Sequence, residues 1–69
     1  MATIYQRLGR KIRKLRKLKG LSQEALAEAA KLDLTTLSEV ESGKQNPSLK
    51  TVYKISLALK IPLSELFSF

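Results

Sequence analysis

The sequence predicts an all-α fold, a compact bundle of five helices. Apolar residues recur at every third or fourth position along five successive segments, and residues that favour helix ends flank these segments. No segment shows the strict alternation of apolar and polar residues that is typical of a half-buried strand. A chain of 69 residues is too short for two separate cores, so we expect a single domain over residues 1–69.

The first helix is predicted over residues 3–19. Thr3 and Gln6 have the spacing of a capping box, and Gly20 is a residue type that often follows a helix end. The apolar stripe of this helix, which we expect to face the core, consists of Ile4, Tyr5, Leu8, Ile12 and Leu15. Arg16 lies at the edge of that stripe. Because a buried arginine usually has a carboxylate partner, we expect one elsewhere in the chain.

Two short helices follow. Ser22 is a favourable N-cap for a second helix of about two turns. Asp33 is a favourable N-cap for a third helix over residues 34–42, and Gly43 is expected to end it.

The fourth and fifth helices complete the chain. Ser48 is the expected N-cap of the fourth helix, whose apolar positions are Leu49, Val52, Ile55 and Leu59. Pro62 marks a break before a last short helix over residues 63–67.

Composition and charge limit the possible functions. The net charge of +7 is uneven, because residues 1–19 carry +8 and residues 20–69 carry −1. A basic surface of this kind favours a polyanionic partner. Without cysteine or histidine, the chain lacks disulfides, the usual zinc ligands, the commonest general base and the most reactive nucleophile. These absences argue against an enzyme and a metal site.

The chain shows no apolar run long enough to cross a membrane and no signal-peptide pattern at its N-terminus. We therefore expect a soluble, cytoplasmic protein. No cofactor and no small-molecule ligand is expected.

The second and third helices have a helix-turn-helix pattern. Only Lys31, Leu32 and Asp33 separate them, and so short a turn permits a steep crossing when a small residue lies at the contact. Ala27 is that small residue. The apolar residues expected on the inner faces are Leu26, Ala30, Leu32, Leu37 and Val40.

The chain resembles the phage-repressor and Cro type of helix-turn-helix regulators, the XRE family, over roughly residues 7–67. The stretches that carry the resemblance are Gly20-Leu21-Ser22-Gln23, Leu26-Ala27, Leu37-Ser38, Glu41-Ser42-Gly43-Lys44 and Asn46-Pro47-Ser48-Leu49. The resemblance implies a lambda-repressor-like DNA-binding domain with its helix-turn-helix unit at residues 22–42. It also implies a structural ion pair between Arg16 and Glu41. The turn position that is commonly glycine in this family is Lys31, so we expect Lys31 to adopt a left-handed backbone conformation at a cost of ~1 kcal/mol.

The resemblance further implies that the third helix lies in the major groove of double-stranded DNA. The residues carried over as candidates for base readout are Leu34, Thr35, Thr36, Ser38 and Glu39. Candidates for phosphate contacts lie at the start of the second helix and beyond the third: Ser22, Gln23, Lys44, Asn46, Ser48 and Lys50. For the basic face of the first helix, a solvated surface and long-range attraction of DNA both remain open.

Similar proteins bind palindromic operators as two-fold dimers. The end of this chain is more apolar than the surface of a monomer requires, so we predict a homodimer through residues 57–69. The predicted contact residues are Leu63, Leu66, Phe67 and Phe69.

Several functions remain open at this stage. A transcriptional regulator without a ligand-sensing domain is favoured, because residues 1–69 leave no room for one. The Leu32-Asp33 and Thr35 pattern is similar to that of restriction-modification controller proteins, although Leu34 stands where they often have arginine. The alternatives are an antitoxin, whose main partner is a toxin protein, and membrane binding by the first helix.

Overall fold

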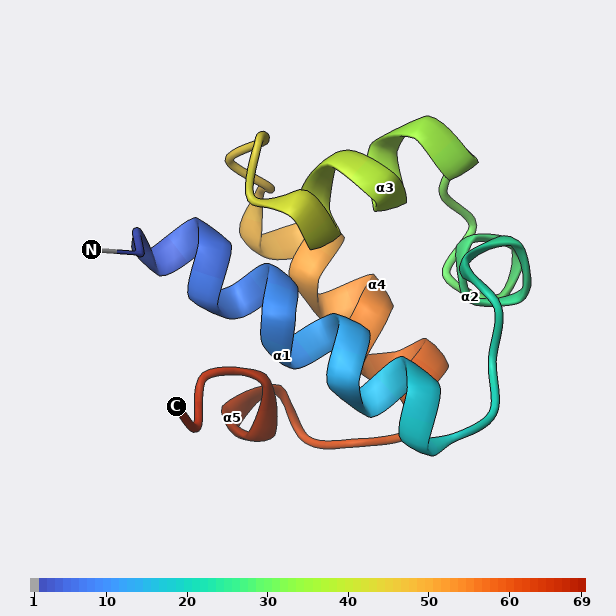
Figure 1. The fold of residues 1–69 in the computed structure, drawn as a ribbon. Coiled ribbons are helices and arrows are strands. Elements are labelled where there is room, and N and C mark those ends of the chain that lie inside the picture. The colour runs from blue at the N-terminus through green and yellow to red at the C-terminus, as the bar shows by residue number, and fades with distance from the viewer. Residues whose placement is uncertain (1) are drawn as a thin grey trace.

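The computed structural model describes residues 2–69, which form five α-helices and no strand (Figure 1). The helices are α1 (Ile4–Leu18), α2 (Gln23–Ala29), α3 (Leu34–Ser42), α4 (Leu49–Leu59) and α5 (Leu63–Leu66). The all-α, five-helix prediction is confirmed. The predicted first and last helices each extend slightly too far, because the residues at their predicted ends act as caps in the structure.

The predicted N-caps form. The Thr3 N–H donates to Oε1 of Gln6 at 2.9 Å and the Gln6 N–H donates to the Thr3 hydroxyl at 3.1 Å, which completes the capping box of α1. Ser22, Asp33 and Ser48 each accept a hydrogen bond from the backbone N–H three residues later. These bonds satisfy N–H groups that have no partner within the helix.

Left-handed residues follow the helix ends. Gly20 and Gly43 have φ values of 70° and 77°, as expected for the glycine that follows a helix. Lys31 has φ 57°, so its predicted left-handed conformation is confirmed. Lys60, at the end of α4, adopts the same conformation with φ 58°, which the sequence did not indicate.

One cluster of apolar side chains lies between the helices. Helix α1 packs against α3 and α5, α2 packs against α3 and α4, and α4 packs against α5. The buried apolar residues are Leu8, Ile12, Leu26, Ala27, Ala30, Leu37, Val40, Val52, Ile55, Leu59 and Leu66. Ile4 and Tyr5, at the start of the predicted stripe of α1, are exposed because the neighbouring elements do not cover this first turn.

The structure corrects one predicted dimer residue. Leu66 is fully buried in the core of its own chain, so its side chain cannot meet a second copy. Leu63 is half-buried and packs against the same core, whereas Phe67 and Phe69 are exposed. In the short helix α5, Leu66 points directly into the core and Leu63 lies at the edge of the same face.

The close contact between α1 and α3 depends on Gly9. A β-carbon at this position would overlap the carbonyl oxygens of Val40 and Glu41 at the end of α3. The absence of a side chain therefore lets the two helix backbones approach each other. Within residues 2–69, none of the helices is both long and apolar enough to span a lipid bilayer.

Candidate nucleic-acid interface

A buried ion pair fixes the end of α3 on α1. Nε of Arg16 donates to Oε2 of Glu41 at 2.8 Å, and Nη2 donates to Oε1 at 3.1 Å. Nη1 of Arg16 donates to the carbonyl oxygen of Leu21 at 2.8 Å, which connects the pair to the segment that leads into α2. The predicted pairing of Arg16 with Glu41 is confirmed. Its geometry is that of a two-bond arginine–carboxylate contact, which is directional as well as strong.

Gln23 also belongs to this cluster. Its side-chain amide donates to Oε1 of Glu41 at 3.1 Å, so it points inward rather than toward an approaching phosphate. The side chain of Gln23, a predicted phosphate contact, is therefore occupied by Glu41, which leaves only its backbone N–H, at the first position of α2. There the N–H lacks a partner within the helix.

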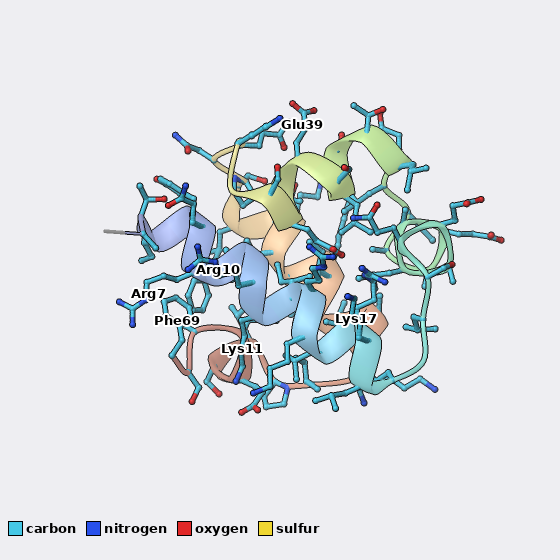
Figure 2. All side chains as sticks on the ribbon, in the orientation of Figure 1. Arg7, Arg10, Lys11, Lys17, Glu39 and Phe69 are labelled. Carbon is cyan, nitrogen blue, oxygen red and sulfur yellow. The ribbon has the colours of Figure 1, made fainter. Side chains whose placement is uncertain are left out.

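The readout candidates lie along the accessible side of α3. Thr35 and Ser38 are exposed, and Leu34 has 43% of its surface exposed. Thr36 and Glu39 are partly buried. In Figure 2, Glu39 projects from α3 on the side away from α1. None of these five readout candidates on α3 carries a positive charge.

Asp33 has a structural role at the start of α3. The pKa of its carboxyl is lowered, chiefly by the hydrogen bond from the Thr36 side chain, with further lowering by the Thr36 backbone N–H. Burial acts in the opposite direction. The ionised carboxylate accepts the Thr36 backbone N–H at 3.3 Å and so caps the helix.

The second group of phosphate candidates lies between α3 and α4. Lys44, Asn46, Ser48 and Lys50 are all exposed, and they lie within seven consecutive residues. The Ser48 hydroxyl accepts from the Thr51 N–H and also contacts the Thr51 hydroxyl, each at 3.1 Å. Lys44 and Lys50 are the two positively charged members of this group.

The positive charge is concentrated on α1, whereas the segment with the helix-turn-helix unit is net negative. Residues 20–50 contain three lysines and five acidic residues, so this segment is net negative. On α1, Lys11 lies 4.0 Å from Glu65, and the guanidinium carbon of Arg7 lies 5.0 Å from the centre of the Phe69 ring. Figure 2 shows Arg7 and Phe69 side by side. The remaining exposed cations of α1 have no such partner within residues 2–69.

An apolar groove lies beside the exposed end of the chain. Its lining residues are Ile4, Tyr5, Leu8, Pro47, Leu49, Val52 and Phe67. The rings of Phe67 and Phe69 are 6.5 Å apart. Of the residues that line this groove, the sequence prediction for the end of the chain included Phe67 but missed Ile4, Tyr5 and Leu49. Their signal was available, because apolar residues in the first turn of a helix can extend beyond the core.

The geometry agrees with comparisons to known proteins. The sequence model of the helix-turn-helix family matches residues 12–66. The control protein C.MunI of a Mycoplasma species is 52% identical over 69 residues, which cover 99% of this chain and 93% of that protein. The control protein C.BamHI of Bacillus amyloliquefaciens is 40% identical, covering 88% of this chain and 76% of its relative.

A solved structure gives the same result for the fold. The restriction-modification controller protein C.AhdI from Aeromonas hydrophila superimposes with a TM-score of 0.90 at 43% identity, covering 91% of this chain and 96% of that one. The sequence and the fold therefore agree on the family. The chain belongs to the XRE-type helix-turn-helix family of DNA-binding transcriptional regulators.

Proposed function

We propose that this protein is a sequence-specific regulator that binds a palindromic DNA operator as a homodimer, with α3 in the major groove. The observation that carries the proposal is the position of α3. Its C-terminal end is fixed by the Arg16–Glu41 pair, and its outer face remains accessible between two groups of candidate phosphate contacts. A fixed helix with a free outer face can place its side chains against base edges in the groove.

The chemistry of α3 suits readout by short side chains. Leu34 can contact the methyl group of thymine, and the threonine and serine hydroxyls can bond base edges or phosphates. The Glu39 carboxylate can accept a hydrogen bond from the amino group of cytosine. Because α3 has no cation, sequence choice at this surface depends on short polar and apolar contacts.

Phosphate contacts would fix the register of the helix. The N-terminus of α2 presents free backbone N–H groups beside Ser22, and such groups favour an anion. Lys44, Asn46 and Lys50 would contact the backbone on the other side of α3. Contacts of this kind position the protein without reading sequence.

The dimer interface is proposed at the C-terminal end of the chain. Phe67 and Phe69 are exposed by 41% and 43%, and Phe67 lines the apolar groove together with Ile4, Tyr5 and Leu49. Leu63 would contribute its exposed part. Leu66 is excluded because it is buried in its own chain. A second copy that covered these side chains would remove apolar surface from water, which favours association.

The similarity to control proteins supports the same role for this chain, in the cytoplasm, where its DNA would be found. We propose that it controls genes of a restriction-modification system. The match to C.MunI covers 99% of this chain, so the similarity is not confined to the helix-turn-helix unit.

Selection of bound sequences from a random pool of duplexes tests the proposal. The expected product is a palindrome, because two copies related by a two-fold axis read the same bases on opposite strands. A pool without enrichment contradicts sequence-specific binding, and an enriched site without symmetry contradicts the homodimer. Sedimentation of the free protein provides an independent measure of its oligomeric state, and Phe67→Ser should shift it toward the monomer.

A further inference from the structure

The cations on the outer side of α1 are not used by the proposed interface. Four of them form a row that we call the α1 basic stripe: Arg10, Arg13, Lys14 and Lys17. All four are exposed, and together with Leu18 they line a shallow surface groove. In the part of the chain that the structure describes, the ion pairs are Arg16–Glu41 and Lys11–Glu65, so no carboxylate neutralises the stripe.

The stripe points in a different direction from the readout face. Gly9 marks the side of α1 that meets α3, and Ile12 marks the side that meets the core. At 100° per residue, the stripe is centred about a quarter turn from Gly9 and nearly opposite Ile12. Figure 2 shows Glu39 on the far side of α3 from α1, where a duplex read by α3 would lie. A straight duplex in that place does not face the stripe.

The charge pattern of the stripe matches a phosphate backbone. Its residues recur at intervals of three or four along α1, so they form a row about 10 Å long on one side of the helix. Duplex DNA carries one negative charge per ~1.7 Å of its axis, so several phosphates can lie along such a row. Arginine and lysine side chains neutralise these phosphates without reading sequence.

From these observations we propose that the α1 basic stripe binds the backbone of a second DNA segment while α3 occupies the operator. The protein thereby bridges two duplexes, one bound by sequence and the other by charge. This inference rests on the proposed function for the operator-bound state. It assigns a second DNA segment to the cations of α1, which do not face the duplex read by α3.

Energy transfer between two labelled duplexes tests the bridge. One duplex carries the full selected palindrome, so that both recognition helices of a dimer are occupied, and the other has an unrelated sequence. The stripe variant is Arg10→Gln, Lys14→Gln, Lys17→Gln. A control variant, Lys31→Gln, Lys54→Gln, Lys60→Gln, removes the same charge from positions outside the stripe. Thermal unfolding confirms that both variants fold.

The wild-type protein is expected to bring the two duplexes together at low salt. The stripe variant should require at least about tenfold more protein for the same transfer, because each lost phosphate contact lowers affinity and its salt dependence. Its affinity for the operator alone should change by no more than about threefold, since the stripe does not face that duplex. The control variant should bridge as the wild type does.

Other outcomes overturn the inference. Equal transfer by the stripe variant and the wild type means that the stripe does not hold a second duplex. An equal loss of operator affinity and transfer means that it contacts the operator duplex itself. An equal loss in the stripe and control variants indicates a general effect of net charge. If selection yields no operator, the proposed function fails, whereas transfer between two unrelated duplexes still measures charge-dependent bridging by the stripe.

Discussion

Arg16 and Glu41 are 25 residues apart in sequence, yet their side chains meet through two hydrogen bonds of 2.8 and 3.1 Å. Both residues are largely buried, with 8% and 6% of their surfaces exposed. The pair joins the C-terminal end of α3 to α1 and so fixes the direction in which the outer face of α3 points. It therefore connects the stability of the fold to the geometry of the proposed DNA-recognition surface.

Removing one member of this pair should strongly destabilise the protein. In Arg16→Met the Glu41 carboxylate stays buried without its partner, and loss of one partner of a buried pair costs about 3–5 kcal/mol. A cost of this size is a large part of the total stability of a small domain. Urea denaturation measures it, and a loss below about 1 kcal/mol would mean that the pair is effectively solvated.

A double variant separates the loss of the ion pair from the cost of leaving one charge buried without a partner. In Arg16→Met with Glu41→Leu neither charge remains, so we expect a smaller loss than the sum of the two single variants. Gln23 and the Leu21 carbonyl would still lose their partners. Additive losses would show that the two side chains do not act as a pair.

The left-handed conformation of Lys31 predicts a stabilising substitution. Its φ of 57° places a β-carbon in a region that glycine occupies without strain. Lys31→Gly should gain up to ~1 kcal/mol, which raises the Tm of a domain of this size by roughly 4–8 °C. As a control, Lys54→Gly places glycine inside α4 and should lower the Tm. A Tm for Lys31→Gly at or below that of the wild type contradicts the strain.

The fold followed closely from local sequence signals. Ser22, Asp33 and Ser48 each bond to a backbone N–H three residues away, so a short stretch of sequence is enough to locate the start of a helix. The partner of Arg16 could not be located from local sequence in this way. Spacing showed only that a partner was needed, and the family resemblance supplied Glu41.

The remaining features depend on tertiary packing. Gly9 is required by the backbone of α3, which no local pattern describes. The burial of Leu66 depends on how α5 returns to the core, so the apolar end of the chain could not be divided in advance into core and free surface. Gln23 likewise turns inward because Glu41 lies beside it.

Substitutions at two glycines are expected to destabilise the protein for different reasons and by different amounts. Gly9→Ala should destabilise the protein by about 1–3 kcal/mol, because the added methyl group meets backbone carbonyls that cannot move independently. Gly20→Ala adds a β-carbon in open space, so only its φ of 70° opposes it, at ~1 kcal/mol. Thermal unfolding of both variants compares them. A larger loss for Gly20→Ala than for Gly9→Ala would contradict the close helix contact.

Asp33 predicts a specific response to acid. Its folded-state pKa lies below its ordinary value of 3.8, so the ionised form is favoured by folding. The stabilisation is present above the unfolded pKa and is lost as pH falls through the folded value. The Tm of the wild type should therefore fall more steeply below about pH 4 than that of Asp33→Asn, which keeps an amide oxygen as a cap. Parallel curves would show that the carboxylate adds nothing beyond the cap.

Glu39 predicts a change in base preference. The Glu39 carboxylate can only accept hydrogen bonds, whereas the amide of Glu39→Gln can also donate, a combination suited to adenine. Selection with the variant should therefore move one position of each half-site from cytosine toward adenine, with discrimination of about 1–3 kcal/mol. Loss of a negative charge should also raise its affinity for unrelated DNA. Glu24→Gln removes the same charge from α2 and should raise affinity without altering the selected sequence. An unchanged site for Glu39→Gln would mean that Glu39 faces phosphates rather than bases.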